Sequence, residues 1–219
     1  DAALGEDDHE QYHDPTHSDD PYWAVPLNRL VVASTTTSTQ DELCGAPANS
    51  WGWHDPGAIH TAKIFGAPRG ATVRYRLRDR DTGAVSKTHS ARLPPAAGAD
   101  ATLRLVTFGD LGRGSFDDAT SWHEYGTAAK YTAKALATHE SVWADAIYHV
   151  GDISYAVGIS AIWDLYAHMM SPAVSKVPYF LNVGNHEYDA PSAAYADKGR
   201  ERSFYNGSDS GGECGVPTH

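Results

Sequence analysis

Three short stretches of the chain place potential metal ligands where apolar runs end. Asp110 lies in GDLG, Asp152 and Tyr155 lie in GDISY, and Asn185 and His186 lie in GNHE. Carboxylate, phenolate and amide oxygens form a hard ligand set that, with added imidazoles, suits Fe(III), Mn or Zn. An Asp next to Gly is also typical of a turn or a helix cap when it stands alone. The three stretches together predict a metal site.

The runs that precede these stretches predict three strands of one sheet. They are LRLVTF at 103–108, AIYHV at 146–150 and YFLNV at 179–183. Each is rich in aliphatic and aromatic residues, so we expect central strands that are covered on both faces. Polar residues at the ends of such strands occupy the edge where α/β folds carry their chemistry.

Two helices are expected between these strands. The first covers 120–140 and begins with a possible capping box of Ser121 and Glu124. The second covers 160–170 and is expected to end at Pro172. The resulting order is βαβαβ, which predicts parallel strands.

The spacing of parallel strands bears on the kind of metal site. Neighbouring strands lie roughly 4.8 Å apart, so carboxylates that leave adjacent strand ends start about 5 Å apart. That separation is close to the roughly 3.5–4 Å between the ions of two-metal phosphoesterase sites. One carboxylate is therefore able to bridge two ions.

In this order and spacing, the three stretches resemble the DxG, GDxxY and GNH(D/E) blocks of the purple acid phosphatases, a family of calcineurin-like metallophosphoesterases. The resemblance implies a binuclear centre of Fe(III) and a divalent metal, which is Zn, Mn or Fe. In that centre Asp110 and Tyr155 would bind the iron, Asp152 would bridge both metals and Asn185 would bind the divalent ion. His186 would be the acid or a group that orients the substrate. The implied reaction is direct hydrolysis of phosphate monoesters at acidic pH.

The segments 44–64 and 208–217 resemble parts of the large plant-type members of this family, in which a fibronectin-III-like domain precedes the catalytic domain. The expected fold is therefore mixed α+β. It has a partial β-sandwich at 28–93, a linker at 94–101 and the first half of a metallophosphoesterase domain at 102–219. Within the sandwich, residues 70–93 predict two strands joined by a turn at 81–83.

The resemblance also implies ligands that this sequence does not contain. Complete members carry three later histidine ligands in VxxH and GHxH blocks, and His219 does not occupy a ligand position of the family pattern. We therefore expect a fragment or a degenerate relative in which full activity is doubtful. One alternative is a phosphodiesterase or nucleotide pyrophosphatase of the same family. Another is a non-catalytic relative that acts as an interaction module.

Composition limits the partners of the chain. Its 219 residues have a formal net charge of −11, which argues against nucleic acid and anionic membranes as partners. The acidic stretch 1–27 has few aliphatic residues, so we expect a disordered leader, with accessory metal binding as the alternative. The expected partner is a phosphate ester, and the sequence does not determine the oligomeric state.

The cysteines bear on the compartment. Cys44 and Cys214 suit one disulfide in an oxidising compartment, although either could pair with a cysteine outside this sequence. Asn206 begins a glycosylation sequon. The family resemblance implies a secreted protein or a vacuole-like compartment. His149, inside a predicted strand, is interpreted as a core imidazole rather than a ligand.

Overall fold

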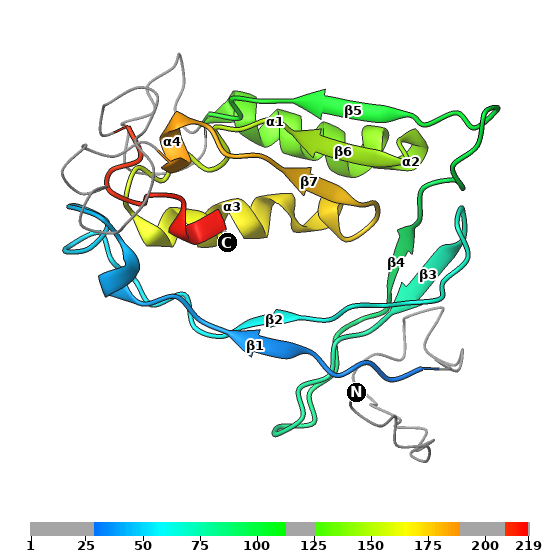
Figure 1. Ribbon diagram of the computed structural model, residues 1–219, viewed down its shortest axis with the longest axis horizontal. Coiled ribbons are helices and arrows are strands. Elements are labelled where there is room, and N and C mark those ends of the chain that lie inside the picture. The colour runs from blue at the N-terminus through cyan, green and yellow to red at the C-terminus, as the bar shows by residue number, and fades with distance from the viewer. Residues whose placement is uncertain (1–28, 113–125, 189–208, 219) are drawn as a thin grey trace.

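The computed structural model describes residues 29–112, 126–188 and 209–218. Figure 1 shows a strip of short β-strands on one side and an α/β unit on the other. The segment 209–218 ends in the turn η4 (Val216–Thr218) and lies beside the α/β unit. The expected leader at 1–27, the capping box and the sequon all lie outside the described residues.

The first strands form two separate antiparallel pairs. β1 (Ser34–Thr36) pairs with β2 (Ile59–Thr61), and a single turn, η2 (Gln40–Glu42), lies between them in sequence. β3 (Thr72–Tyr75) pairs with β4 (His89–Arg92), so the two strands predicted within 70–93 are confirmed. In place of the two packed sheets of a sandwich, the described residues carry these two-stranded sheets. The sandwich at 28–93 and the linker at 94–101 therefore stay predictions.

The α/β unit has the predicted βαβαβ order. Its elements are β5 (Leu105–Phe108), α1 (Thr127–Ala135), η3 (Leu136–Glu140), α2 (Ser141–Trp143), β6 (Ala146–His149), α3 (Ser160–Val174), β7 (Tyr179–Leu181) and α4 (Asn185–Tyr188). The strands are parallel in the order β5-β6-β7, so their carboxyl ends meet at one edge of the sheet. β6 is the central strand.

Both helical segments extend beyond their predicted ends. The first continues from α1 through a π-helical turn, η3, and ends with α2 at Trp143. α3 passes through Pro172 and ends at Val174, so the expected end at Pro172 is wrong. Pro172 has no N–H to donate to the ladder, and its ring crowds the carbonyl four residues earlier, yet the helix continues past it. The helix then needs just one more turn, which Ser175 closes by donating its N–H to the Ser171 carbonyl at 3.1 Å.

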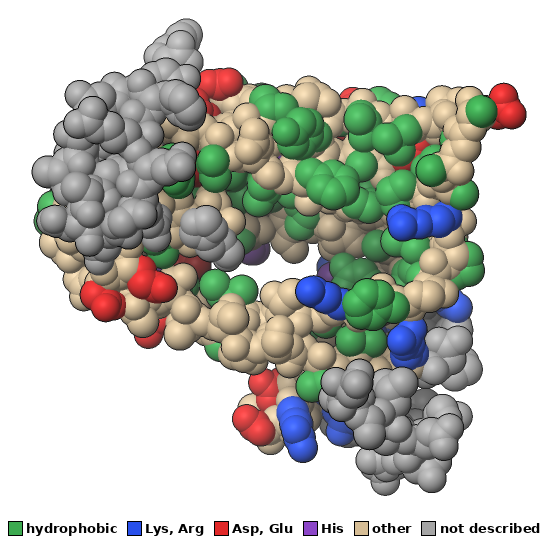
Figure 2. Space-filling view, in the orientation of Figure 1, with side chains coloured by type: hydrophobic (Ala, Val, Ile, Leu, Met, Phe, Trp, Pro, Cys, Tyr) green, Lys and Arg blue, Asp and Glu red, His purple; other side chains and the backbone are tan. Residues whose placement is uncertain are grey.

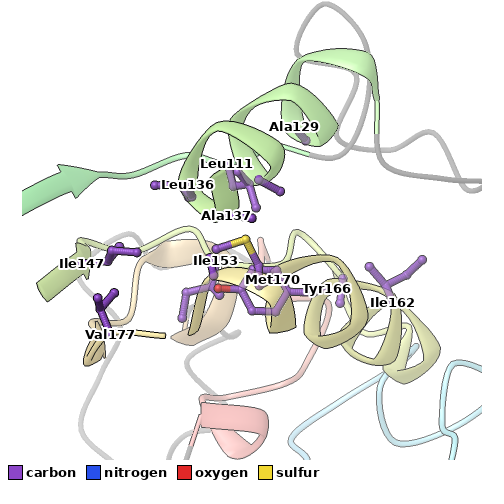
Figure 3. Close-up of a cluster of buried hydrophobic side chains, with 13 residues drawn as sticks. Leu111, Ala129, Leu136, Ala137, Ile147, Ile153, Ile162, Tyr166, Met170 and Val177 are labelled. Atoms are coloured by element: carbon purple, nitrogen blue, oxygen red, sulfur yellow. The ribbon is translucent and has the colours of Figure 1, made fainter. Parts of the chain in front are cut away.

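The main core lies between the sheet and the helices α1 and α3 (Figure 3). Its buried members are Leu111, Ala129, Ala133, Leu136, Ala137, Ile147, Ile153, Ala156, Ile162, Tyr166, Met170, Ala173 and Val177. Val106 and Phe108 of β5 pack against this cluster, while Leu105 of the same strand is 48% exposed. Phe180 of β7 is 55% exposed.

Among the residues that the structure describes, helices therefore cover one face of the sheet and leave the other face open. Hydrophobic side chains gather at the surface over β5, β6 and β7 in Figure 2. The expectation of strands covered on both faces is wrong for β5 and β7, whereas β6 is buried at the successive residues Ala146 and Ile147. No described helix has the length and apolar character needed to cross a bilayer.

Candidate metal centre

The predicted ligands follow the carboxyl ends of the three parallel strands. Asp110 lies just after β5, Asp152 just after β6, and Asn185 begins α4 after β7. The first two loops are joined by their backbones. The Asp110 N–H donates to the Gly151 carbonyl at 3.2 Å, and the Leu111 N–H donates to the Asp152 carbonyl at 3.4 Å. Strand topology thus brings residues 42 positions apart, 110 and 152, into adjacent loops.

Three oxygen-bearing side chains meet at this edge. The Tyr155 hydroxyl lies 3.2 Å from Asp110 Oδ1 and 3.3 Å from Asp152 Oδ2, so its single proton is shared between two carboxylates. Carboxylate and phenol oxygens around one point are a donor set that fits a hard, highly charged cation. Asp110, Asp152 and Tyr155 are the residues predicted to share the iron side of the centre.

The backbone is strained at the same three residues. Asp110 has φ 51°, Asp152 φ 52° and Tyr155 φ 52°. The left-handed region costs an L-residue roughly 1–2 kcal/mol, and a bulky residue such as tyrosine is a genuine outlier there. Such strain persists where the surrounding structure imposes it, and it is common at active sites and ligand clamps.

The electrostatics of the cluster favour a cation. Burial, the negative charges of Asp152 and Asp110, and hydrogen bonding together raise the pKa of the Tyr155 hydroxyl. Burial is also the main cause of the raised pKa of Asp152, to which Asp110 contributes. An oxygen cluster in which the charged forms are disfavoured gains free energy when a cation neutralises it. The two carboxylates and the phenol therefore fit a metal ion by their oxygen donors and by the charge that a cation would neutralise.

The third stretch packs directly on Asp152. The His186 N–H donates to Asp152 Oδ1 at 3.2 Å, and the His186 ring centroid lies 4.3 Å from that of Tyr155. Gly184 allows this approach, because a Cβ at that position would lie 2.0 Å from Asp152 Oδ1. Contacts thus connect Asp110, Asp152, Tyr155 and His186, and Asn185 directly precedes His186 at the start of α4.

Glu187 is the site residue whose role sequence reasoning missed. Its side chain is completely buried. Oε2 accepts the N–H groups of Asp152 and Gly184, both at 2.9 Å, and Oε1 accepts the Ile153 N–H at 2.6 Å. The carboxylate thus links the loops that follow β6 and β7. The only signal in the sequence was its place as the last residue of GNHE.

His149 lies in the core beneath these loops, as predicted. Its ring is fully buried and stacks on Phe108 with a centroid distance of 4.2 Å. Nδ1 lies 2.7 Å from the Tyr179 hydroxyl and 3.3 Å from that of Tyr166. Burial lowers the pKa of His149 to about 4. The ring is therefore neutral over most of the pH range and packs as an uncharged residue.

Imidazole ligands are not part of the described cluster. Within residues 29–112, 126–188 and 209–218, no three His, Cys, Asp or Glu side chains gather as they would around a metal ion. The described oxygen cluster instead combines two carboxylates with a phenol. Asn185 is held nearby through its side-chain amide, whose Nδ2 donates to Asp209 Oδ2 at 2.8 Å.

This part of the chain is similar to known proteins. The model of the calcineurin-like phosphoesterase family matches residues 103–214, which include all the predicted ligands. The probable inactive purple acid phosphatase 27 of Arabidopsis thaliana is 38% identical over 193 residues, which cover 87% of this chain and 30% of that relative. A nucleotide pyrophosphatase/phosphodiesterase of Hordeum vulgare is 33% identical over 132 residues, which cover 60% of this chain and 33% of that relative.

A solved structure shares the fold. The purple acid phosphatase PPD1 from yellow lupin (Lupinus luteus) seeds superposes with a TM-score of 0.71 at 35% identity. The match covers 85% of this chain and 32% of the lupin chain. This chain spans about a third of the length of these relatives.

Proposed function

Because this chain belongs to the calcineurin-like phosphoesterases, as a relative of the plant purple acid phosphatases, we propose that it holds metal for the hydrolysis of phosphate monoesters. The observation that carries the proposal is the position of the Tyr155 hydroxyl, within 3.3 Å of the carboxylates of both Asp110 and Asp152. Phosphate esters are the substrates of the family.

Each predicted ligand has a role in the proposed centre. Asp110 and Tyr155 would hold the Fe(III), Asp152 would be shared by both ions, and Asn185 would offer its amide oxygen to the divalent ion, Zn, Mn or Fe. When bound, the two cations would neutralise phosphoryl charge and lower the pKa of a water molecule to about 7. His186, beside Tyr155 in the cluster, orients the phosphate ester or protonates the departing alkoxide.

A diester or pyrophosphate substrate is the second candidate. The similarity to the Hordeum vulgare nucleotide pyrophosphatase/phosphodiesterase favours it. The non-catalytic alternative gains weight from the Arabidopsis relative, which carries the description "probable inactive". The rates of monoester and dinucleotide hydrolysis by one preparation distinguish the two substrate classes.

Two further features of the chain agree with the proposal. The Cys44–Cys214 disulfide suits the oxidising environment of a secreted or vacuole-like compartment. The antiparallel pairs β1-β2 and β3-β4 precede the α/β unit, as strands of a fibronectin-III-like domain would. We infer that they belong to such a domain.

The test is metal stoichiometry, a visible spectrum and monoester hydrolysis, all on one sample reconstituted with iron and zinc. We expect bound iron to give a phenolate charge-transfer band, and Tyr155→Phe to abolish the band. Tyr131→Phe is the matched control, because that side chain is 68% exposed and lies on α1. A chain without bound metal would overturn the proposal, and a chain that binds metal without turnover would support the non-catalytic alternative.

A further inference from the structure

Among the predicted ligands, Asn185 has a side-chain amide, so its function depends on whether the amide oxygen or the NH2 group faces the metal site. The amide oxygen is a metal ligand, whereas the amide NH2 is a donor and does not bind a cation. Rotation of the amide by half a turn exchanges the two groups. Whatever holds the amide in place therefore decides whether Asn185 presents a ligand.

Asp209 supplies that restraint. Its Oδ2 lies 2.8 Å from Asn185 Nδ2. An ionised carboxylate only accepts hydrogen bonds, so the NH2 group must be the part of the amide that faces it. The reversed amide would place two acceptor oxygens at that distance. The amide oxygen of Asn185 is thereby directed away from Asp209.

The same residue also restrains His186. The backbone carbonyl of Asp209 lies 3.3 Å from His186 Nδ1. A carbonyl only accepts, so Nδ1 carries the hydrogen. In the neutral ring the lone pair is then on Nε2. One residue thus selects the orientation of Asn185 and the tautomer of His186.

Asp209 is held in place although its own side chain is exposed. The next residue, Ser210, is fully buried. Gly211 lies so close to the loop after β6 that a Cβ there would be 2.2 Å from the Val157 carbonyl oxygen. Further along, Cys214 is bonded to Cys44, and the Gly215 N–H donates to the Glu187 carbonyl at 2.7 Å. The segment 209–218 is therefore anchored at both the site and the N-terminal strip.

We propose that Asp209 is a positioning residue, which presents the amide oxygen of Asn185 and the Nε2 of His186 to the metal centre. This proposal rests on the proposed function, because the ligand role of Asn185 belongs to it. The acceptor comes from a loop 24 residues away in sequence, as is common for the outer partners that orient metal ligands. Loss of such partners costs about 10–100-fold in metal affinity.

The first test observes the amide itself, in the metal-free chain labelled with ¹⁵N. The Asn185 side-chain signals are identified by their loss in Asn185→Asp. We expect one of these protons to exchange slowly with water in the wild type and several-fold faster in Asp209→Ala. Asp209→Asn, which keeps an acceptor oxygen, should restore slow exchange.

The second test measures metal affinity by competition with a chromophoric chelator, using zinc and manganese as the probes. We expect Asp209→Ala to weaken binding by about 10–100-fold and Asp209→Asn to weaken it much less. Asp100→Ala is the matched control, because it removes an exposed carboxylate from the turn before β5.

The two tests separate this proposal from the proposed function. Unchanged affinity in Asp209→Ala, or an Asn185 signal that the substitution leaves untouched, would overturn the positioning role even if the wild type binds metal. The wild type could instead bind no metal while its Asn185 signal responds to Asp209→Ala. That result would confirm the hydrogen bond but overturn the proposed metal site.

Discussion

At the scale of single residues, Glu187 determines how two of the ligand loops lie. Burial raises the pKa of its carboxyl group, while hydrogen bonds from Gly184, Ile153 and Asp152 oppose this shift. The side chain is 0% exposed, and its two oxygens accept hydrogen bonds from all three of these N–H groups. It organises the site without being a predicted ligand.

Replacing Glu187 with Gln should therefore destabilise the protein. The substitution turns one of the two oxygens into an NH2 group. The backbone N–H that faced this oxygen then has no acceptor. An unsatisfied buried donor costs about 1–3 kcal/mol of unfolding free energy, which urea denaturation measures. Glu140→Gln, in the half-buried turn η3, is the control. Equal losses in the two variants would argue against a specific role for Glu187.

At the scale of elements, the site depends on a segment far from its strands. The Cys44–Cys214 disulfide joins residues 170 positions apart. It ties the loop after η2 to the loop that carries Asp209. The Cys44 N–H also donates to the Gly212 carbonyl at 2.9 Å, and the Ala48 N–H to the Gly211 carbonyl at 3.1 Å. The two segments that resemble plant-type family members are thus in direct contact.

Replacing both Cys44 and Cys214 with Ser should lower the unfolding free energy by about 2–5 kcal/mol, since the bond closes a long loop in the unfolded chain. The measurement is the urea midpoint with and without a reducing agent. The wild type should become less stable on reduction, and the double variant should not respond. A wild type indifferent to reduction would show that the contact does not stabilise the fold.

At the scale of the whole molecule, one ion pair joins the starts of two neighbouring strands and makes stability depend on pH. Asp145 accepts from the Arg104 N–H at 2.8 Å and pairs with the Arg104 guanidinium at 3.3 Å, while its side chain is only 7% exposed. The hydrogen bonds from the Arg104 side chain and backbone lower the pKa of Asp145. This pair precedes β5 and β6 and holds their parallel register.

The folded protein should lose the contribution of this pair in acid. A carboxyl whose pKa is lowered on folding stabilises the protein above its unfolded pKa of about 3.9, and the contribution disappears as the pH falls through the folded pKa. Asp145→Asn should therefore be less stable than the wild type at pH 6, and the difference should shrink below about pH 4. Urea midpoints across this range test it. The stability difference that Asp145→Asn causes should be much smaller when Arg104→Met is also present. A difference that stays constant at all pH values would contradict the role of the Arg104–Asp145 pair.

Much of the α/β unit follows from local patterns. Three short apolar runs separated by helical segments determine three parallel strands, and parallel strands place their carboxyl ends together. The neighbourhood of Asp110, Asp152 and Asn185 was therefore predictable, and the GDISY spacing added Tyr155. The exposed face of the sheet was not predictable from the same runs, because an apolar strand does not reveal which of its faces the chain covers.

By itself the sequence determined the family, the order of the elements and the residue types at the site, because these depend on motifs and periodicity over a few residues. Only the tertiary structure decided how Glu187 and Asp209 act. Their hydrogen bonds join loops 23 to 35 residues apart, and the disulfide joins segments 170 residues apart. Such contacts depend on how the loops pack in three dimensions. A loop lacks the sequence periodicity of a helix or strand, so its sequence does not predict which residues contact it.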